Sequence, residues 1–132
     1  MNTEKHKGQK VGPIKDILNK CKYSSQGLIY CYKNETSFIF ETIAIVLAII
    51  FGLIFQITVT EWFFSLISIF LIMEIEFLNT SIEAVVDMCT HEFNPLAKAA
   101  KDCGSAATGL ASIVAAIVNA VIFIPYIWAL IC

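Results

Sequence analysis

The apolar positions of this chain form one interrupted block and three continuous ones. Between Ile14 and Tyr32, apolar residues recur at the three- and four-residue spacing of a single helical face, with lysines between them. This pattern predicts an amphipathic surface helix over residues 14–34. Three long apolar runs follow, at residues 42–59, 62–82 and 105–128. Each run is long enough to cross a hydrocarbon core as a helix, so we predict an all-α integral membrane protein with three transmembrane helices.

Composition places the whole chain, residues 1–132, in one membrane domain. Apolar residues make up 58% of the chain and charged residues 15%, and the mean hydropathy is +0.74. A soluble domain of this length has too little interior to hide so many apolar side chains, so the bilayer has to act as their solvent. A soluble enzyme, a disordered tail and a secreted disulfide scaffold are therefore excluded. Residues 1–12 are polar, and we expect them to form a flexible arm.

The distribution of lysines predicts the orientation in the membrane. The chain has nine lysines and no arginine; seven lysines precede the first apolar run, and Lys98 and Lys101 lie between the second and third runs. Because positive charge is retained on the cytosolic side, we expect a multi-pass membrane protein with its amino terminus in the cytosol and its carboxyl terminus outside. Nucleic-acid binding, which a basic arm can also indicate, is the weaker interpretation, and we expect no nucleic-acid partner.

The most informative segment is EFLNTSIEAVVD, at the end of the second apolar run. Glu76, Asn79, Glu83 and Asp87 are separated by three or four residues and share one face of a helix. A carboxylate in a spanning helix costs about 2.5–3.5 kcal/mol on insertion scales, so intramembrane acids mark functional sites. A single acid in a spanning helix can also have a purely structural role, as a hydrogen-bonding group. Three acids and an amide on one stripe favour a site.

Two other segments carry groups that can complete such a site. Glu35 precedes the first apolar run by the distance that brings it level with Glu83. Two carboxylates at one depth suit magnesium, which takes one or two carboxylates together with phosphate oxygens and water. Lys101 is interpreted either as a phosphate ligand or as an exposed cytosolic lysine. A deeper carboxylate, Glu76, is placed to take a proton from a lipid hydroxyl.

The third predicted helix begins before the membrane and is rich in small residues. Asn94 is a suitable amino-terminal cap and Pro95 a suitable first helical residue. Small residues recur at every fourth position from Gly104, which lets helix backbones approach closely in lipid. Because three spans make a thin bundle, we expect the chain to associate with copies of itself.

EFLNTSIEAVVD and NPLAKAAKDCGSAA together resemble the signature of the small prokaryotic diacylglycerol kinases. The resemblance covers residues 14–125, and KNETSF and HEFNPLAKAAKD are similar to the Gram-positive branch, the undecaprenol kinases. It implies a homotrimer in the bacterial inner (plasma) membrane, with ATP and Mg²⁺ and a membrane lipid as acceptor. Glu74 departs from the family pattern, which has an apolar or small residue there.

The resemblance also implies a role for each matching residue. Glu76 would be the catalytic proton acceptor, Glu35 and Glu83 would bind the magnesium ion, and Asn79 and Asp87 would support them. The ATP-binding residues would be Tyr23, Glu35, Glu83, Glu92, Phe93, Asn94, Lys101 and Asp102. The residues near the lipid substrate would be Glu41, Glu76 and Ser105.

The residue patterns and the resemblance together leave three functions open. The first is an ATP-dependent lipid kinase that converts undecaprenol to undecaprenyl phosphate, and the second is a diacylglycerol kinase that makes phosphatidic acid. The third is a small proton-coupled transporter. Transporters place such acids near the bilayer midplane, whereas these acids cluster toward the predicted cytosolic edge, which favours a kinase.

Overall fold

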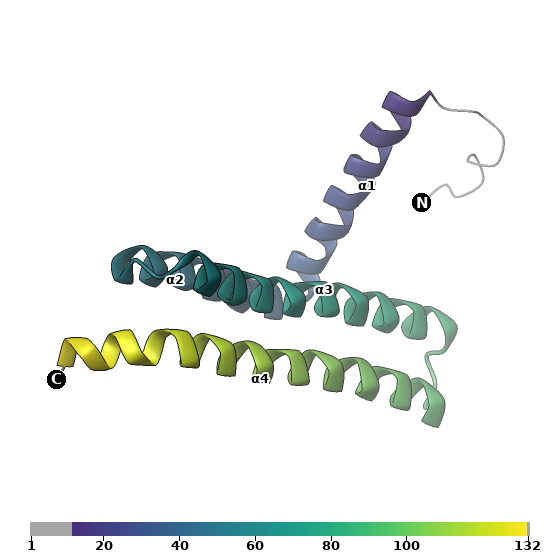
Figure 1. Cartoon of the computed structure of the whole chain (residues 1–132). Coiled ribbons are helices and arrows are strands. Elements are labelled where there is room, and N and C mark those ends of the chain that lie inside the picture. The colour runs from purple at the N-terminus through teal and green to yellow at the C-terminus, as the bar shows by residue number, and fades with distance from the viewer. Residues whose placement is uncertain (1–11, 132) are drawn as a thin grey trace. The chain divides into compact units, whose positions relative to one another are not determined.

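The computed structural model describes residues 12–131, and within that range the regular structure is entirely helical. The predicted flexible arm falls, apart from Gly12, outside the described residues. Figure 1 shows the four helices. They are α1 (Pro13–Asn34), α2 (Ser37–Phe55), α3 (Val59–Cys89) and α4 (Pro95–Ile131). The all-α prediction is therefore confirmed. The chain divides into two compact units, one ending at Asn34 and the other beginning at Glu35.

α1 constitutes the helical part of the first unit. Its apolar side chains stay exposed, with Ile14, Ile17 and Leu18 each at least 60% accessible. On another side of the helix, Lys20 pairs with Asp16 at 2.8 Å, an arrangement typical of a solvated helix face. A helix is present here, and its amphipathic character and its placement on a membrane surface stay predictions.

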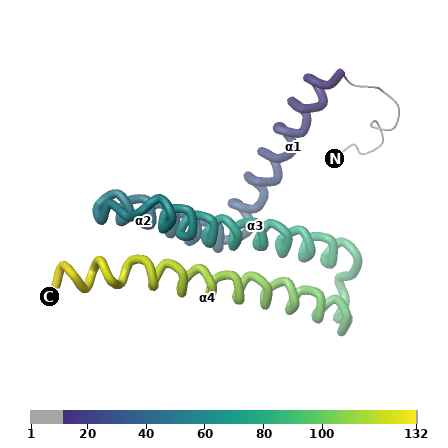
Figure 2. The backbone as a smooth tube through the Cα atoms, in the orientation of Figure 1, coloured from purple at the N-terminus to yellow at the C-terminus, as the bar shows by residue number. Residues whose placement is uncertain are grey.

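The second unit contains three helices that are long and apolar enough to cross a membrane, with 19, 31 and 37 residues. This number agrees with the three predicted spans. α3 and α4 run side by side in opposite directions, and α2 packs mainly on α3 (Figures 1 and 2). Many large apolar side chains on these helices remain exposed, as expected where lipid is the solvent. Where the bilayer begins and ends along each helix stays a prediction.

The turn between α2 and α3 lies at residues 56–58, earlier than residues 60 and 61, which separate the first two predicted apolar runs. The backbone of Gln56 is left-handed, with φ 52°, and this ends α2. Thr58 then caps α3, because its hydroxyl oxygen accepts from the Glu61 N–H at 3.3 Å and the Glu61 carboxylate accepts from the Thr58 N–H at 2.7 Å. This capping box makes Glu61 part of the first turn of α3.

A cluster of hydroxyl and amide groups joins α3 to α4 inside the apolar bundle. Ser65 Oγ donates to Asn119 Oδ1 at 2.6 Å, and Asn119 Nδ2 donates to Ser68 Oγ at 3.2 Å. Both serines are buried. Asn119 Nδ2 also donates to the Ala115 carbonyl at 2.9 Å, within its own helix. Because its members satisfy one another, the cluster sets the register of α3 on α4 without an unpaired buried group.

Replacing Asn119 with alanine is expected to lower the free energy of unfolding by about 1 kcal/mol, because Ser65 loses its partner and Ser68 loses a donor. The measurement is thermal unfolding in detergent micelles. Ser112→Ala is the control, because the exposed Ser112 hydroxyl donates only to the Thr108 carbonyl of its own helix. Equal melting temperatures for the two variants would contradict the assigned role of the cluster.

Candidate active site

The predicted acid stripe lies on α3 and runs from a buried end to an exposed end. Glu76 is 5% exposed and Asn79 7% exposed, whereas Glu83 is half-buried and Asp87 is exposed. Asn79 Nδ2 donates to Glu83 Oε1 at 3.3 Å, so the amide connects the two ends. One helix face therefore offers a carboxylate inside the apolar bundle and others near the α3–α4 loop.

An aromatic contact places the start of α2 beside this stripe. Phe38 has no exposed surface and packs on Phe77, with ring centroids 4.6 Å apart. Glu35 stands three residues before Phe38. Its partial burial, together with repulsion from Glu83 and Glu76, raises the pKa of Glu35. The structure therefore brings Glu35 within electrostatic reach of both carboxylates.

Glu41, the second carboxylate of α2, is 8% exposed and lies within electrostatic reach of Glu76. Its Oε2 atom is buried without a hydrogen-bond partner among the described residues, and the same holds for Asn79 Oδ1 and Thr80 Oγ1. A buried polar group without a partner costs about 1–3 kcal/mol. Unpaired atoms on residues next to Glu76 in space or in sequence are the pattern expected where a polar group binds.

α4 approaches the stripe most closely at Gly104. A Cβ atom at this position would lie 2.1 Å from Asn79 Oδ1, far inside van der Waals contact. Gly104 is buried, and because it has no side chain, α4 leaves room at this point for the Asn79 amide. The sequence predicted close packing around Gly104, and the structure shows which side chain occupies the space.

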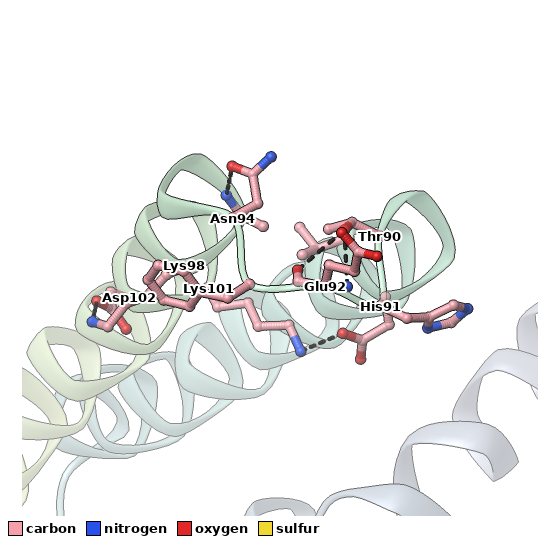
Figure 3. Close-up of a pocket in the computed structure, with 11 residues that line it drawn as sticks. Thr90, His91, Glu92, Asn94, Lys98, Lys101 and Asp102 are labelled. Carbon is pink, nitrogen blue, oxygen red and sulfur yellow. Dashed lines mark hydrogen bonds and ion pairs between the residues drawn. The ribbon is translucent and has the colours of Figure 1, made fainter.

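Beyond the exposed end of the stripe, the α3–α4 loop forms an open pocket of about 590 Å³ (Figure 3). Five predicted nucleotide-binding residues line it together: Glu92, Phe93, Asn94, Lys101 and Asp102. Asp87 and Lys98 line it as well. The structure thus gathers at one place residues that are separated by up to fifteen positions in the sequence.

Two ion pairs and a helix cap shape this pocket. Lys101 Nζ pairs with Asp87 Oδ1 at 2.5 Å and joins α4 to α3, and Lys98 pairs with Asp102 one turn along α4 (Figure 3). Lys101 therefore faces the exposed end of the stripe, and its role as a phosphate ligand stays a prediction. Asn94 Oδ1 accepts from the Leu96 N–H at 2.9 Å and caps α4, which confirms the predicted start of this helix.

Two predicted site residues lie outside these groups. Tyr23 is half exposed on α1, in the other unit, and Ser105 is exposed on α4 without lining the pocket.

Within residues 12–131, no three His, Cys, Asp or Glu side chains gather closely enough to hold a metal ion. Two further polar residues lie here that were not predicted as site residues: His91 lines the pocket, and Thr80 stands one helical turn from Glu76.

A buried carboxylate stripe that leads to a lysine-bearing polar pocket defines a small helical membrane enzyme. This chain belongs to the prokaryotic diacylglycerol kinase family, whose model matches residues 22–123. The protein is accordingly a lipid kinase, which confirms the resemblance seen in the sequence and leaves the transporter interpretation without support.

Curated relatives carry two different acceptor lipids in their names. The chain is 31% identical to undecaprenol kinase of Bacillus subtilis (strain 168) over 103 residues, covering 78% of this chain and 84% of the relative. It is 38% identical to diacylglycerol kinase of Escherichia coli (strain K12) over 101 residues, covering 76% and 83%. It is 36% identical to diacylglycerol kinase of Haemophilus influenzae over 102 residues, covering 77% of this chain and 86% of the relative.

Replacing Gly104 with alanine is expected to lower turnover about tenfold to hundredfold, because the new Cβ displaces the Asn79 amide from Glu83. The matched control is Gly109→Ala on the same helix, where nothing lies within 4 Å of the added Cβ. Gly109→Ala should keep full activity and gain about 0.5–1 kcal/mol of stability from helix propensity. The measurements are phosphate transfer and thermal unfolding, and equal turnover in the two variants would refute the role of Gly104.

Proposed function

We propose that this protein transfers the γ-phosphate of ATP to the hydroxyl of undecaprenol, giving undecaprenyl phosphate. The observation that carries the proposal is the α3 stripe, which leads from Glu76 inside the bundle to the polar pocket at the α3–α4 loop. A lipid alcohol can reach the buried end and a nucleotide the open end. Phosphoryl transfer requires mainly that the two be positioned and that their charge be neutralised.

Undecaprenol as the acceptor rests on the similarity of KNETSF and HEFNPLAKAAKD to the undecaprenol kinase branch. Diacylglycerol, giving phosphatidic acid, is the second candidate. It is favoured by the higher identity to the Escherichia coli and Haemophilus influenzae enzymes, 38% and 36% against 31%. Both acceptors present an alcohol to the same carboxylate.

Glu76 is the proposed general base. Its burial at 5% exposure keeps water away from the reacting hydroxyl, and Asn79 and Glu41 beside it surround the acceptor oxygen with polar groups. Lys101, paired with Asp87 across the pocket, supplies positive charge to the nucleotide phosphates. Glu92, Phe93, Asn94 and Asp102 line the same pocket and hold the rest of the nucleotide, while Tyr23 and Ser105 are assigned to the nucleotide and the lipid by resemblance.

Glu35 and Glu83 fit a magnesium ion bound together with ATP. The two carboxylates are hard oxygen ligands that repel each other in the absence of a cation, and magnesium takes only one or two carboxylates when phosphate oxygens and water complete its shell. The ion would supply charge neutralisation at the phosphates. Asn79, bonded to Glu83, holds one of the two ligands in place.

We also propose that the chain works as a homotrimer in the bacterial plasma membrane, with its amino terminus in the cytosol. The exposed apolar side chains of α1 suit a helix that lies in the membrane interface, and the nine lysines suit a cytosolic arm and loop. The exposed small residues of α4, such as Ser112 and Ala116, leave a face on which a neighbouring copy can pack closely.

The function is tested by phosphate transfer from labelled ATP in detergent micelles that contain undecaprenol or diacylglycerol. Glu76→Gln is expected to lower turnover at least about a hundredfold, because the amide cannot accept the proton, while Mg-ATP binding stays close to wild type. Glu83→Gln should weaken Mg-ATP binding as well. Wild-type turnover in Glu76→Gln would refute the proposed base, and transfer to diacylglycerol alone would replace the proposed acceptor.

Binding of Mg²⁺ with a non-hydrolysable ATP analogue is expected to weaken as the pH falls through the raised pKa of Glu35. The protonated carboxyl does not bind the cation, and burial and the neighbouring carboxylates favour protonation. Without the cation, the contribution of Glu35 to folding stability changes with pH in the opposite direction to Mg-ATP binding. A raised pKa in the folded state means that stability is greatest at low pH and decreases as the pH rises through that pKa.

Glu35→Gln should reduce the pH dependence of both measurements, titration calorimetry for binding and thermal unfolding in EDTA for stability. Asp16→Asn is the control, because Asp16 pairs with Lys20 on the exposed face of α1. If Glu35→Gln kept the wild-type pH profiles, Glu35 would not be a magnesium ligand.

A further inference from the structure

Thr80 is a polar residue of the site that none of the roles above uses. It follows Glu76 by four residues and precedes Glu83 by three, so it lies on the same face of α3. The residue is 5% exposed, and its Oγ1 atom is buried without a hydrogen-bond partner among residues 12–131.

Among the buried hydroxyls of residues 12–131, only that of Thr80 lacks a partner, because the Ser65 and Ser68 hydroxyls are both bonded. The next residue, Ser81, donates to the Phe77 carbonyl at 2.8 Å, and Thr42 on α2 donates to the Phe38 carbonyl at 2.7 Å. The same bond, to the carbonyl four residues earlier, is the ordinary solution for a threonine inside a helix. The Thr80 hydroxyl does not take it. Its donor is therefore available to a group that enters the site.

The position of Thr80 along α3 indicates which group this is. The polar pocket begins at Val86, six residues or about 9 Å further along the helix. Glu76 is one turn away in the other direction. The two remaining unpaired atoms, Glu41 Oε2 and Asn79 Oδ1, belong to residues close to Glu76 in space or in sequence. The Thr80 hydroxyl thus belongs to the buried end of the stripe, where the lipid alcohol of the proposed function would bind.

We propose that Thr80 donates a hydrogen bond to the oxygen of the lipid alcohol that is phosphorylated. The proposal rests on the function proposed above and adds a substrate-contacting residue to it. An alcohol oxygen can donate its proton to Glu76 and accept the Thr80 hydrogen, which leaves a lone pair directed at the γ-phosphorus. In the reaction the O–H proton passes to Glu76, a new O–P bond forms, and the bond from the γ-phosphorus to the β–γ bridging oxygen breaks, releasing ADP.

The experiment compares Thr80→Val, which keeps the shape and removes the hydroxyl, with Thr80→Ser, which keeps the hydroxyl. In micelles containing undecaprenol or dioleoylglycerol, Thr80→Val should lower kcat/KM for the lipid about three- to tenfold and leave KM for ATP unchanged. The kcat/KM of Thr80→Ser should stay within about twofold of wild type. The same is expected of the control Ser81→Ala, which removes the hydrogen-bonded hydroxyl of the adjacent residue. Without lipid alcohol, Thr80→Val should melt no lower than wild type, because the removed group had no partner.

A second measurement separates this proposal from the proposed function. The rise in melting temperature caused by undecaprenol or dioleoylglycerol is measured without ATP, and it should be smaller for Thr80→Val than for wild type. If wild type transfers phosphate to neither lipid, the proposed function fails, and the lipid-induced shifts still decide the role of Thr80.

Three results would overturn the role of Thr80. One is an equal lipid-induced rise in melting temperature for wild type and Thr80→Val. Another is a change confined to KM for ATP, which would assign the hydroxyl to the nucleotide. The third is a lower melting temperature of Thr80→Val without lipid alcohol, which would assign the hydroxyl to a structural bond, for example with a neighbouring copy.

Discussion

Phe38 on α2 packs on Phe77 on α3, and the carboxylates of the site are arranged around this contact. Phe38 has no exposed surface, and the ring of Phe77 lies next to Glu76 in the sequence. The contact holds the start of α2 against the middle of α3, so that Glu35 and Glu41 lie within electrostatic reach of Glu76. Carboxylates that repel one another would separate if the helices were free to slide. Aromatic burial supplies the attraction that keeps them together.

The bundle contains two polar clusters, one around Asn119 and one around Glu76. They differ in whether their buried polar atoms are hydrogen-bonded. Ser65, Ser68 and Asn119 bond to one another across α3 and α4 and present no unpaired buried atom. The groups around Glu76 include three buried atoms without partners, on Glu41, Asn79 and Thr80. A buried polar group that only supports the fold finds its hydrogen-bond partner within the protein. A group that binds a substrate has no such partner until the substrate is present. This contrast supports the location of the proposed lipid site.

The α3–α4 loop places the open polar pocket next to the exposed end of the acid stripe. α3 continues past its apolar part to Cys89, and α4 begins at Pro95, so both helices carry polar side chains into the pocket. Lys101 on α4 forms an ion pair with Asp87 on α3, which links the two helices at the pocket. The pocket and the buried stripe share one helix, which would keep the proposed lipid at Glu76 and the proposed nucleotide at Lys101 in a fixed relation.

Local pattern alone determined much of this protein. The number of long helices, the Asn94 cap and the spacing that puts Glu76, Asn79 and Glu83 on one face follow from periodicity and capping, which depend on neighbouring residues. The turn at residues 56–58 did not follow, because the apolar run continues through it and the capping box of Thr58 and Glu61 decides where α3 begins. Only the tertiary structure showed that Gly104 makes room for Asn79 and that the Thr80 hydroxyl has no partner. Both facts depend on which helix face meets which neighbour, and packing between distant segments decides that.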